Sequence, residues 1–242
     1  MTEPPDGTFV ALATKKVIAT AGMNFMLSPC THQRGLELGY RDGTVFYTLG
    51  RGGVLGDVDP DVVTAAFGFF AAPWVRERWQ SGRQLRDPRQ ASALYAAECA
   101  RWGEQNLVHS DDLARWCKLA EQLLDAVDPA GLPLFAAWRA EPRAAEGRGL
   151  AMLLIHLLRE WRGGLHLLST VALGRQMVRA ALDDGGAKHA ASHGWNEPWP
   201  APSGGSWQQA EDLTDQLCAQ VFDRVLSESE RADFCDLLPV RR

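Results

Sequence analysis

The amino-acid sequence predicts a mainly α-helical, multi-helix bundle. Ala, Leu, Arg, Glu and Gln dominate its long segments, and the alternating runs of β-branched residues that form strands hardly occur. Of the 242 residues, 46% are hydrophobic and 23% are charged, which is the composition of a globular protein. A chain of this length buries roughly 70–75% of its unfolded surface, so it needs no disulfides to stay folded.

The first half of the chain is expected to form a series of helices. Glycines interrupt the chain before Asp59 and Pro60, a pair that favours a helix start, and Ser110 is expected to cap a later helix. The expected helices cover residues 8–22, 31–49, 60–79, 88–107, 111–127 and 134–138.

The second half begins with the most apolar segment, residues 149–182. It is expected to form a central helix, or a pair of helices broken at Gly163–Gly164. Residues 183–206 are rich in Gly, Pro, Ser and Trp without periodicity, and they are expected to form a long loop.

Two capping-box patterns follow, and each is expected to open one of the last two helices. They pair Ser206 with Gln209 and Ser227 with Glu230. We expect residues 1–147 to form an N-terminal helical part. Residues 148–242 would hold the central helix, the loop and the C-terminal helices, and together the two parts would make one compact unit.

Charge and cysteine content restrict the classes of protein. The net charge is -5 and the isoelectric point is near 5.7, so the whole molecule lacks the positive field of a non-specific DNA binder. The five cysteines are scattered without a C-x-x-C pair and are expected to be reduced and mostly buried. No export signal is visible, and the longest apolar stretch is far short of the roughly 20 residues that span a bilayer. We expect a soluble, cytoplasmic protein without membrane contact.

Two motifs resemble those of an actinobacterial family of helix-turn-helix-related proteins, often called SalHTH-type. The first, G-R-x-x-x-L-G, is met by Gly50, Arg51, Leu55 and Gly56. The second, L-x-R-E-x-R-G-x-x-H, is met by Leu157, Arg159, Glu160, Arg162, Gly163 and His166. The resemblance covers roughly residues 30–180. It implies a mostly helical fold whose C-terminal part is related to the winged helix of MarR-type regulators, which are dimeric and respond to ligands.

The chain departs from that family's pattern. Gly164 and Phe69 stand where typical members carry an acid and an Asn. The segment HGWNEPWP takes the place of the recognition helix and wing, and its prolines lack backbone donors. We therefore expect a winged-helix-related part without its wing, and weak or no specific binding of duplex DNA.

His156 and Glu160 are the first candidates for chemistry. They are four residues apart, so on one helix they differ by about 40° and face the same way. A buried carboxylate must be paired, which makes a structural ion-pair network one interpretation, with Arg159, Arg162 or His156 as local partners. The alternative is a pocket in which Glu160 and His166 transfer protons. That pair would require a bend at Gly163–Gly164, while metal binding would lack ligands beyond the first two.

Further residues are candidates for holding a ligand. Arg51 and Arg162 would bind an anionic group, and aromatic side chains would line the pocket. Trp195 stands in the expected loop, where it could close over a ligand or pack. The remaining candidate ligand-binding residues are His156, Trp161 and Phe67. His189 and His193 are expected to be surface histidines of the loop.

Three functional hypotheses follow. The first is a small-molecule-binding protein, which as an enzyme of secondary metabolism would use Glu160 and His166 as acid and base without a nucleotide cofactor. The second is a MarR-like, ligand-responsive transcriptional regulator, as the resemblance implies. The third is a non-catalytic scaffold or partner protein. We expect no cofactor and no bound metal, and we expect a homodimer.

Overall fold

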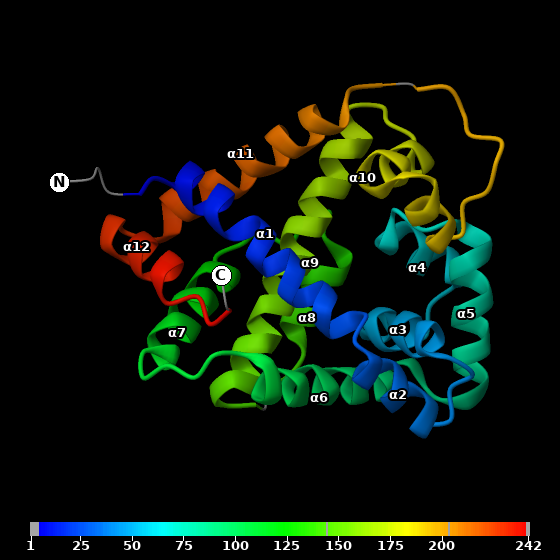
Figure 1. Ribbon diagram of the computed structural model, residues 1–242, viewed down its shortest axis with the longest axis horizontal. Coiled ribbons are helices and arrows are strands. Elements are labelled where there is room, and N and C mark those ends of the chain that lie inside the picture. The colour runs from blue at the N-terminus through cyan, green and yellow to red at the C-terminus, as the bar shows by residue number, and fades with distance from the viewer. Residues whose placement is uncertain (1–4, 144, 203, 241–242) are drawn as a thin grey trace.

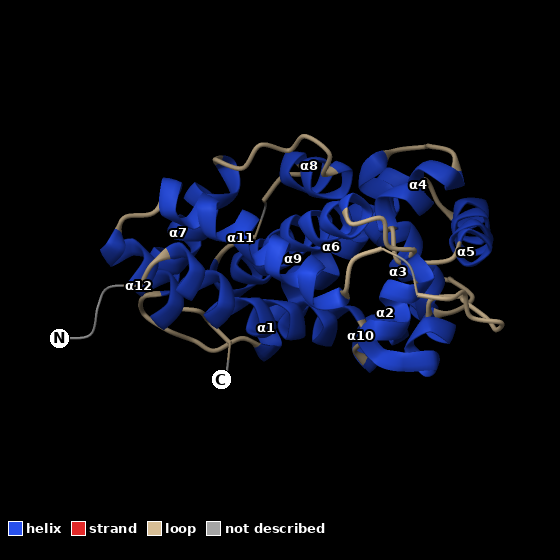
Figure 2. Cartoon of the chain, turned by 90° about the horizontal axis from the view of Figure 1, so that it is seen from above, coloured by secondary structure: helices blue, strands red, loops and turns tan. Residues whose placement is uncertain are grey.

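A computed structural model describes residues 5–143, 145–202 and 204–240. These residues form helices and connecting loops without any β-strand, which confirms the mainly α, multi-helix prediction (Figure 2). No strand is therefore available for a wing within the described residues. None of the described helices is long and apolar enough to cross a membrane.

The N-terminal part consists of eight α-helices and one short 3-10 helix. Their bounds are α1 (Gly7–Met26), α2 (Pro29–Glu37), α3 (Gly43–Gly52), η1 (Gly53–Leu55), α4 (Pro60–Phe67), α5 (Ala72–Leu85), α6 (Pro88–Asn106), α7 (Leu113–Asp125) and α8 (Pro133–Ala140). The prediction of one helix over residues 31–49 is wrong, because the chain turns at Gly39, where φ is +91°, and begins α3. The prediction over 60–79 fails in the same way at Gly68, where φ is +69°.

The C-terminal part contains α9 (Gly147–Ala172), α10 (Met177–Ser192), α11 (Trp207–Val225) and α12 (Glu228–Asp236). α9 runs through Gly163–Gly164 without a break, so of the two alternatives the central helix is confirmed there and the pair of helices broken at these glycines is wrong. The loop expected from residue 183 begins only after α10, whose two halves meet at Gly185–Gly186 with non-helical backbone angles. Both predicted capping boxes are present at the starts of α11 and α12.

α9 is the central element of the fold. It packs against α1, α6, α7, α8 and α11, and Figure 1 shows α1 crossing it. Its side chains Met152, Ile155 and Leu158 are almost fully buried in the core. Several residues of α9 between Arg159 and Leu167 line the cavity described below. The division at residue 147 stays a prediction.

Four of the five cysteines are buried and all five are free thiols, as expected from their scattered positions. Cys30 is exposed. Burial raises the pKa of the Cys99 thiol well above its usual value, and that of Cys117 to about 11. These two side chains therefore act as small apolar groups of the core.

Candidate functional site

A cavity of about 450 Å³ lies between α1, α3, α9, α10 and the segment from α4 to α5. Cavities of roughly 300–1,000 Å³ are typical of small-molecule sites. In Figure 2, α10 lies at one face of the molecule and α4 at the other, so the cavity is covered from both sides. Its aromatic lining consists of Tyr47, Phe67, Phe69, Phe70, Trp74, Phe135 and Trp207.

One face of α9 forms a wall of this cavity. Arg162, Gly163 and His166 come three, four and seven residues after Arg159 along the helix, which places the four residues on one side. A Cβ atom on Gly163 would meet no atom within 4 Å outside its own helix. The cavity therefore continues up to the backbone of α9.

α10 covers the cavity with small side chains. Its buried residues are three alanines, and two of them, Ala180 and Ala181, line the cavity. The C-terminal end of α10 is attached to the segment before α5, because the His193 carbonyl accepts a hydrogen bond of 2.9 Å from the Ala71 amide. The His193 ring also stacks on Phe70 at 4.2 Å between centroids.

Glu160 forms a bidentate ion pair with Arg51. Arg51 Nε and Nη2 donate to the two carboxylate oxygens, each at 2.8 Å, and both side chains are nearly inaccessible to solvent. Burial opposes ionisation of Glu160, but the charge and hydrogen bonds of Arg51 outweigh it and lower the carboxyl pKa to about 2. Glu160 is therefore a carboxylate at neutral pH, held by a partner 109 positions away in sequence.

Arg51 has further contacts that fix its guanidinium. Nη1 donates to the Tyr47 hydroxyl at 2.8 Å, and the group lies over the Phe67 ring, 4.5 Å from its centroid. The geometry engages Arg51 with Glu160 rather than leaving it to a ligand. This arrangement matches the ion-pair interpretation, although the local partners expected from sequence make only longer contacts. Arg159 lies 3.4 Å and His156 3.9 Å from Glu160 Oε1.

His166 stands at the other end of the same wall. Its Nδ1 lies 3.1 Å from the Thr214 hydroxyl and 3.3 Å from Glu211 Oε1, whereas Nε2 is buried and has no hydrogen-bond partner. Its ring stacks on Phe69 and meets the edge of Trp207. Burial lowers the pKa of His166, so the imidazole is neutral at pH 7.

Arg162 belongs to a cluster between α1, α9 and α11. Its Nη2 donates to Glu211 at 2.8 Å and to Asp215 at 2.9 Å, and Lys15 also pairs with Asp215 at 2.5 Å. Two cations thus face two carboxylates. The cluster joins α11 to the wall of the cavity.

The structure brings together five of the eight predicted site residues. Glu160, His166, Arg51, Arg162 and Phe67 all line the cavity. Glu160 and His166 border it from one straight helix, so the bend that the acid–base hypothesis required does not arise.

The other three predicted site residues lie outside the cavity. His156 is buried among Phe25, Tyr95 and Trp138. Trp161 packs against Phe222, and the Trp195 indole donates to the Phe69 carbonyl at 2.8 Å. Among the described residues, no group of three or more His, Cys, Asp and Glu side chains is placed to hold a metal ion.

Many residues of the cavity were not among the predicted site residues. Lys15, Arg159, Gly163 and His193 are four of them, and His193 directly follows α10, in a segment predicted to be a loop. The step from Arg159 through Gly163 to His166 along one helix was visible in the sequence. The contribution of Lys15 was not, because it depends on how α1 crosses α9.

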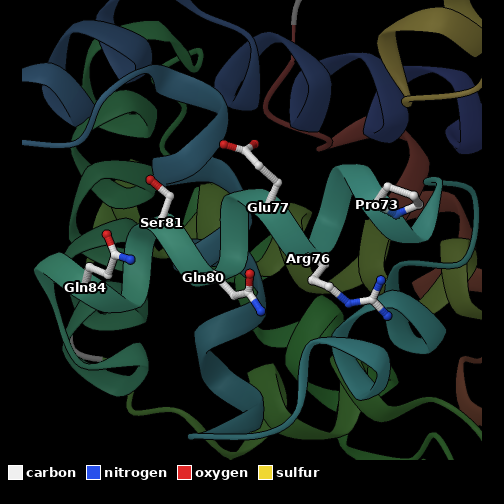
Figure 3. A pocket seen from close by; sticks show the side chains of 6 residues that line it. All are labelled: Pro73, Arg76, Glu77, Gln80, Ser81 and Gln84. Atoms are coloured by element: carbon white, nitrogen blue, oxygen red, sulfur yellow. The ribbon is translucent and has the colours of Figure 1, made fainter.

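Two other hollows lie elsewhere on the surface. One, of about 410 Å³, is lined by side chains of α5 alone, and Figure 3 shows these residues along the outer side of that helix. Its charged members are paired, Arg76 with Asp61 and Glu77 with Arg41. The other lies between α7 and the start of α9. Neither has the aromatic lining or the unpartnered buried imidazole of the first cavity.

The comparison with known protein families adds the decisive observation. The profile of a helix-turn-helix family matches residues 11–205, about four fifths of the chain. The chain belongs to this helix-turn-helix family. The match spans α1 to α10 and thus includes the cavity-lining residues of α9 and α10. No curated protein and no solved structure matches the chain.

Membership of the helix-turn-helix family is consistent with a regulator-like role, because such units commonly place their second helix in the DNA major groove. The SalHTH-type and MarR-like assignments are finer than this match and stay predictions.

α10 carries charges of both signs around its turn at Gly185–Gly186. Lys188 is exposed in the half after Gly186, and Asp183 and Asp184 precede the turn.

Proposed function

We propose that this helix-turn-helix protein is a regulator-like protein that binds a small molecule in the cavity between α9 and α10. The single observation that carries the proposal is the aromatic-lined cavity of about 450 Å³ against α9. Its lining combines apolar and aromatic side chains with polar groups, and neighbours fix several of these polar groups, such as Arg51 and Glu160, as in sites that orient a ligand. The acid–base hypothesis finds less support, because both oxygens of Glu160 are occupied by Arg51.

A ligand in this cavity would contact both α9 and α10. Only three of the 16 residues of α10 are buried, and all three are alanines, which have small side chains. Additional contacts from a ligand would therefore restrict its motion more than that of the packed helices. This would connect ligand binding with the position of α10.

The proposal is tested with a thermal-shift screen of aromatic compounds on three proteins. Gly163→Phe would project a ring into the open space beside α9, whereas Gly163→Ala adds only a methyl group there. Compounds that bind the cavity should raise the melting temperature of the wild type and of Gly163→Ala, but not that of Gly163→Phe. Equal shifts in all three proteins would place the compounds elsewhere and contradict the proposal.

DNA binding is a second candidate function, favoured by membership of the helix-turn-helix family. The two halves of α10 around Gly185–Gly186 are the part of the chain that would be examined first. A fluorescence-anisotropy titration with duplexes from the neighbouring genome region tests it. Saturable, sequence-selective binding below about 10⁻⁸ M would support a specific operator. The homodimer, the cytoplasmic location and a role in secondary metabolism stay predictions.

A further inference from the structure

The cavity has an excess of one positive charge at the Glu160 end. Arg51 and Arg159 share the single carboxylate of Glu160, and the contact of Arg159 is the longer one, 3.4 Å from Nη1. At the His166 end, Arg162 and Lys15 face Glu211 and Asp215, and a further carboxylate of the lining, Asp184, pairs with His189, so this end has no excess of positive charge from lysine and arginine. A ligand with one anionic group would neutralise the excess, and Arg159 has donors available for a carboxylate.

The other end of the cavity accepts a hydrogen bond. Thr214 donates its hydroxyl proton to the Ala210 carbonyl at 2.6 Å, so toward His166 it can act only as an acceptor. Glu211, the second neighbour of Nδ1, is also an acceptor when ionised. Nδ1 therefore carries the proton of the neutral imidazole, and Nε2 is an acceptor without a partner.

A buried acceptor without a partner costs free energy, and this one belongs to a side chain that lines the cavity. A hydroxyl or N–H group of a ligand would satisfy Nε2. A ligand that offered only an acceptor there would be rejected, because two lone pairs would face each other.

The spacing of the two polar positions sets the length of the ligand. Arg159 and His166 are seven residues apart on α9, which corresponds to roughly 10 Å along the helix axis. A single aromatic ring is too short to reach both. Between them lies the open space at Gly163, and the rings of Phe67, Phe69 and Trp207, which suit flat aromatic surfaces, also line the cavity.

We infer that the cavity takes an elongated aromatic acid of two or three rings, with its carboxylate at Arg159 and a hydroxyl or N–H donor at His166 Nε2. The inference rests on the proposed function and adds the chemical class of the ligand. His166 then determines specificity because it accepts a hydrogen bond from the donor group of the ligand. Arg159 does so because it pairs with the ligand's carboxylate.

The test compares matched probes by calorimetric titration of the wild-type protein. The probe 4′-hydroxybiphenyl-4-carboxylate spans the two positions. Its comparison compounds are biphenyl-4-carboxylate, the 4′-methoxy analogue, the methyl ester of the hydroxy acid, and 4-hydroxybenzoate. We expect the hydroxy acid to bind about tenfold or more tightly than each of them, which corresponds to about 1.4 kcal/mol. Equal affinities, or no binding of the hydroxy acid, would overturn the inference.

Two variants assign the preferences to their residues. His166→Asn retains a donor near the position of Nδ1 and removes Nε2, so it should reduce the preference for hydroxyl over hydrogen to less than about twofold. Arg159→Met retains the apolar stem and should reduce the preference for the acid over its methyl ester to less than about twofold. A full preference in both variants would overturn the assignment, and the comparison of probes on the wild type holds even where a variant does not fold.

The result separates the ligand class from the proposed function. If neutral or single-ring compounds bind the wild type and Gly163→Ala but not Gly163→Phe, the cavity is a ligand site and the inferred class is wrong. If the hydroxy acid binds Gly163→Phe as tightly as the wild type, the proposed function itself is contradicted.

Discussion

Glu160 and Arg51 show at the scale of single residues how the site is held together. Both side chains are nearly inaccessible to solvent, and the carboxylate accepts two hydrogen bonds from the guanidinium. Removing one partner of a buried pair leaves the other charge uncompensated. Glu160→Gln should therefore lower the free energy of unfolding by about 3–5 kcal/mol, measured by urea denaturation at pH 7.

Two controls accompany this variant. Arg159→Met leaves the pair with Arg51 intact and should cost less than about 1 kcal/mol. Replacing both partners, as Arg51→Met with Glu160→Leu, should recover much of the loss, because no buried charge remains. A Glu160→Gln protein that melts like the wild type yet loses ligand binding would instead favour the hypothesis of a pocket acid.

His156 supplies a prediction on pH dependence. Both ring nitrogens are buried without hydrogen-bond partners, and burial, partly opposed by the charge of Glu160, lowers the histidine pKa from 6.5 to about 4. Between these two pH values the unfolded chain binds a proton that the folded protein excludes. The stabilising contribution of the neutral ring is therefore complete above pH 6.5 and is lost as the pH falls toward 4.

His156→Phe removes this titration while keeping a ring among Phe25, Tyr95 and Trp138. Between pH 7 and pH 5, the variant should lose about 2 kcal/mol less of its unfolding free energy than the wild type. Urea unfolding at both pH values measures the difference. Parallel losses in the two proteins would show that His156 is not held neutral in the fold.

Glycines of α9 and of its neighbour α6 test the packing at the scale of elements. Gly163 faces open space, whereas a Cβ on Gly103 would lie 2.5 Å from the Arg148 carbonyl oxygen and from Met152 Cβ. Gly163→Ala should raise the unfolding free energy by up to about 1 kcal/mol through helix propensity alone. Gly103→Ala, with the same gain in propensity, should lower it because the two helices must separate.

Thermal or urea unfolding of the two variants checks this pair. Opposite signs are expected. A destabilised Gly163→Ala protein with unchanged Gly103→Ala stability would mean that α9 does not adjoin the cavity as described. The pair also serves the binding experiments, since Gly163→Ala is their size control.

At the scale of elements, the sequence predicts which segments are helical better than it predicts where each helix begins and ends. Most long apolar segments and both capping boxes lie where the patterns place them. The helix bounds that were predicted wrongly lie at glycines. Gly68 ends a helix at positive φ, whereas Gly163 and Gly164 stay inside α9, and only neighbouring elements decide between these outcomes. Leu132 lies 2.7 Å from where a Gly164 Cβ would stand, so close packing explains that glycine.

α10 was missed because its composition is that of a loop. Its sequence, MVRAALDDGGAKHAAS, contains two adjacent glycines and has little apolar periodicity. The helix is held by contacts that local patterns do not reveal, such as the His193 ring on Phe70 and the Arg175 side chain on Asp183.

At the scale of the whole molecule, charge limits the binding of DNA. The net charge is -5, and in the helical segment 177–192 the acids Asp183 and Asp184 precede Lys188. Specific binders neutralise several phosphates, and their affinity falls steeply with salt. We expect weak or no specific binding of duplex DNA at physiological salt. Anisotropy titrations at 50 and 200 mM salt should show a shallow salt dependence, and a steep one would contradict this expectation.

The outer face of α1 bears on the predicted homodimer. Phe9 and Leu12 are 56% and 49% exposed and lie within about 60° of one another around the helix, whereas the exposed side chains Met23 and Leu27 line the cavity. Figures 1 and 2 both place α1 at the surface of the molecule. We expect sedimentation equilibrium to give twice the monomer mass of 26.6 kDa, and Leu12→Glu to give the monomer. A wild type that stays monomeric at high concentration would contradict the prediction.

The candidate site could be predicted in part. The second sequence motif contains Glu160, Arg162, Gly163 and His166, which all line the cavity. The partner of Glu160 could not be deduced, because Arg51 lies 109 residues away and meets it only through the packing of α3 near α9. His156 and Trp161 lie on the same helix but face the core. They were predicted to bind a ligand from their residue types, which do not show which way a side chain faces.

The proposed function depends most on where a small molecule binds. A crystal structure of the wild-type protein with a compound from the thermal-shift screen tests this directly. We expect the compound between α9 and α10, against the backbone of Gly163 and within reach of Arg159 and His166. A compound bound on the outer surface, with Phe69, Phe70 and Trp74 closed over an occluded cavity, would contradict the central claim.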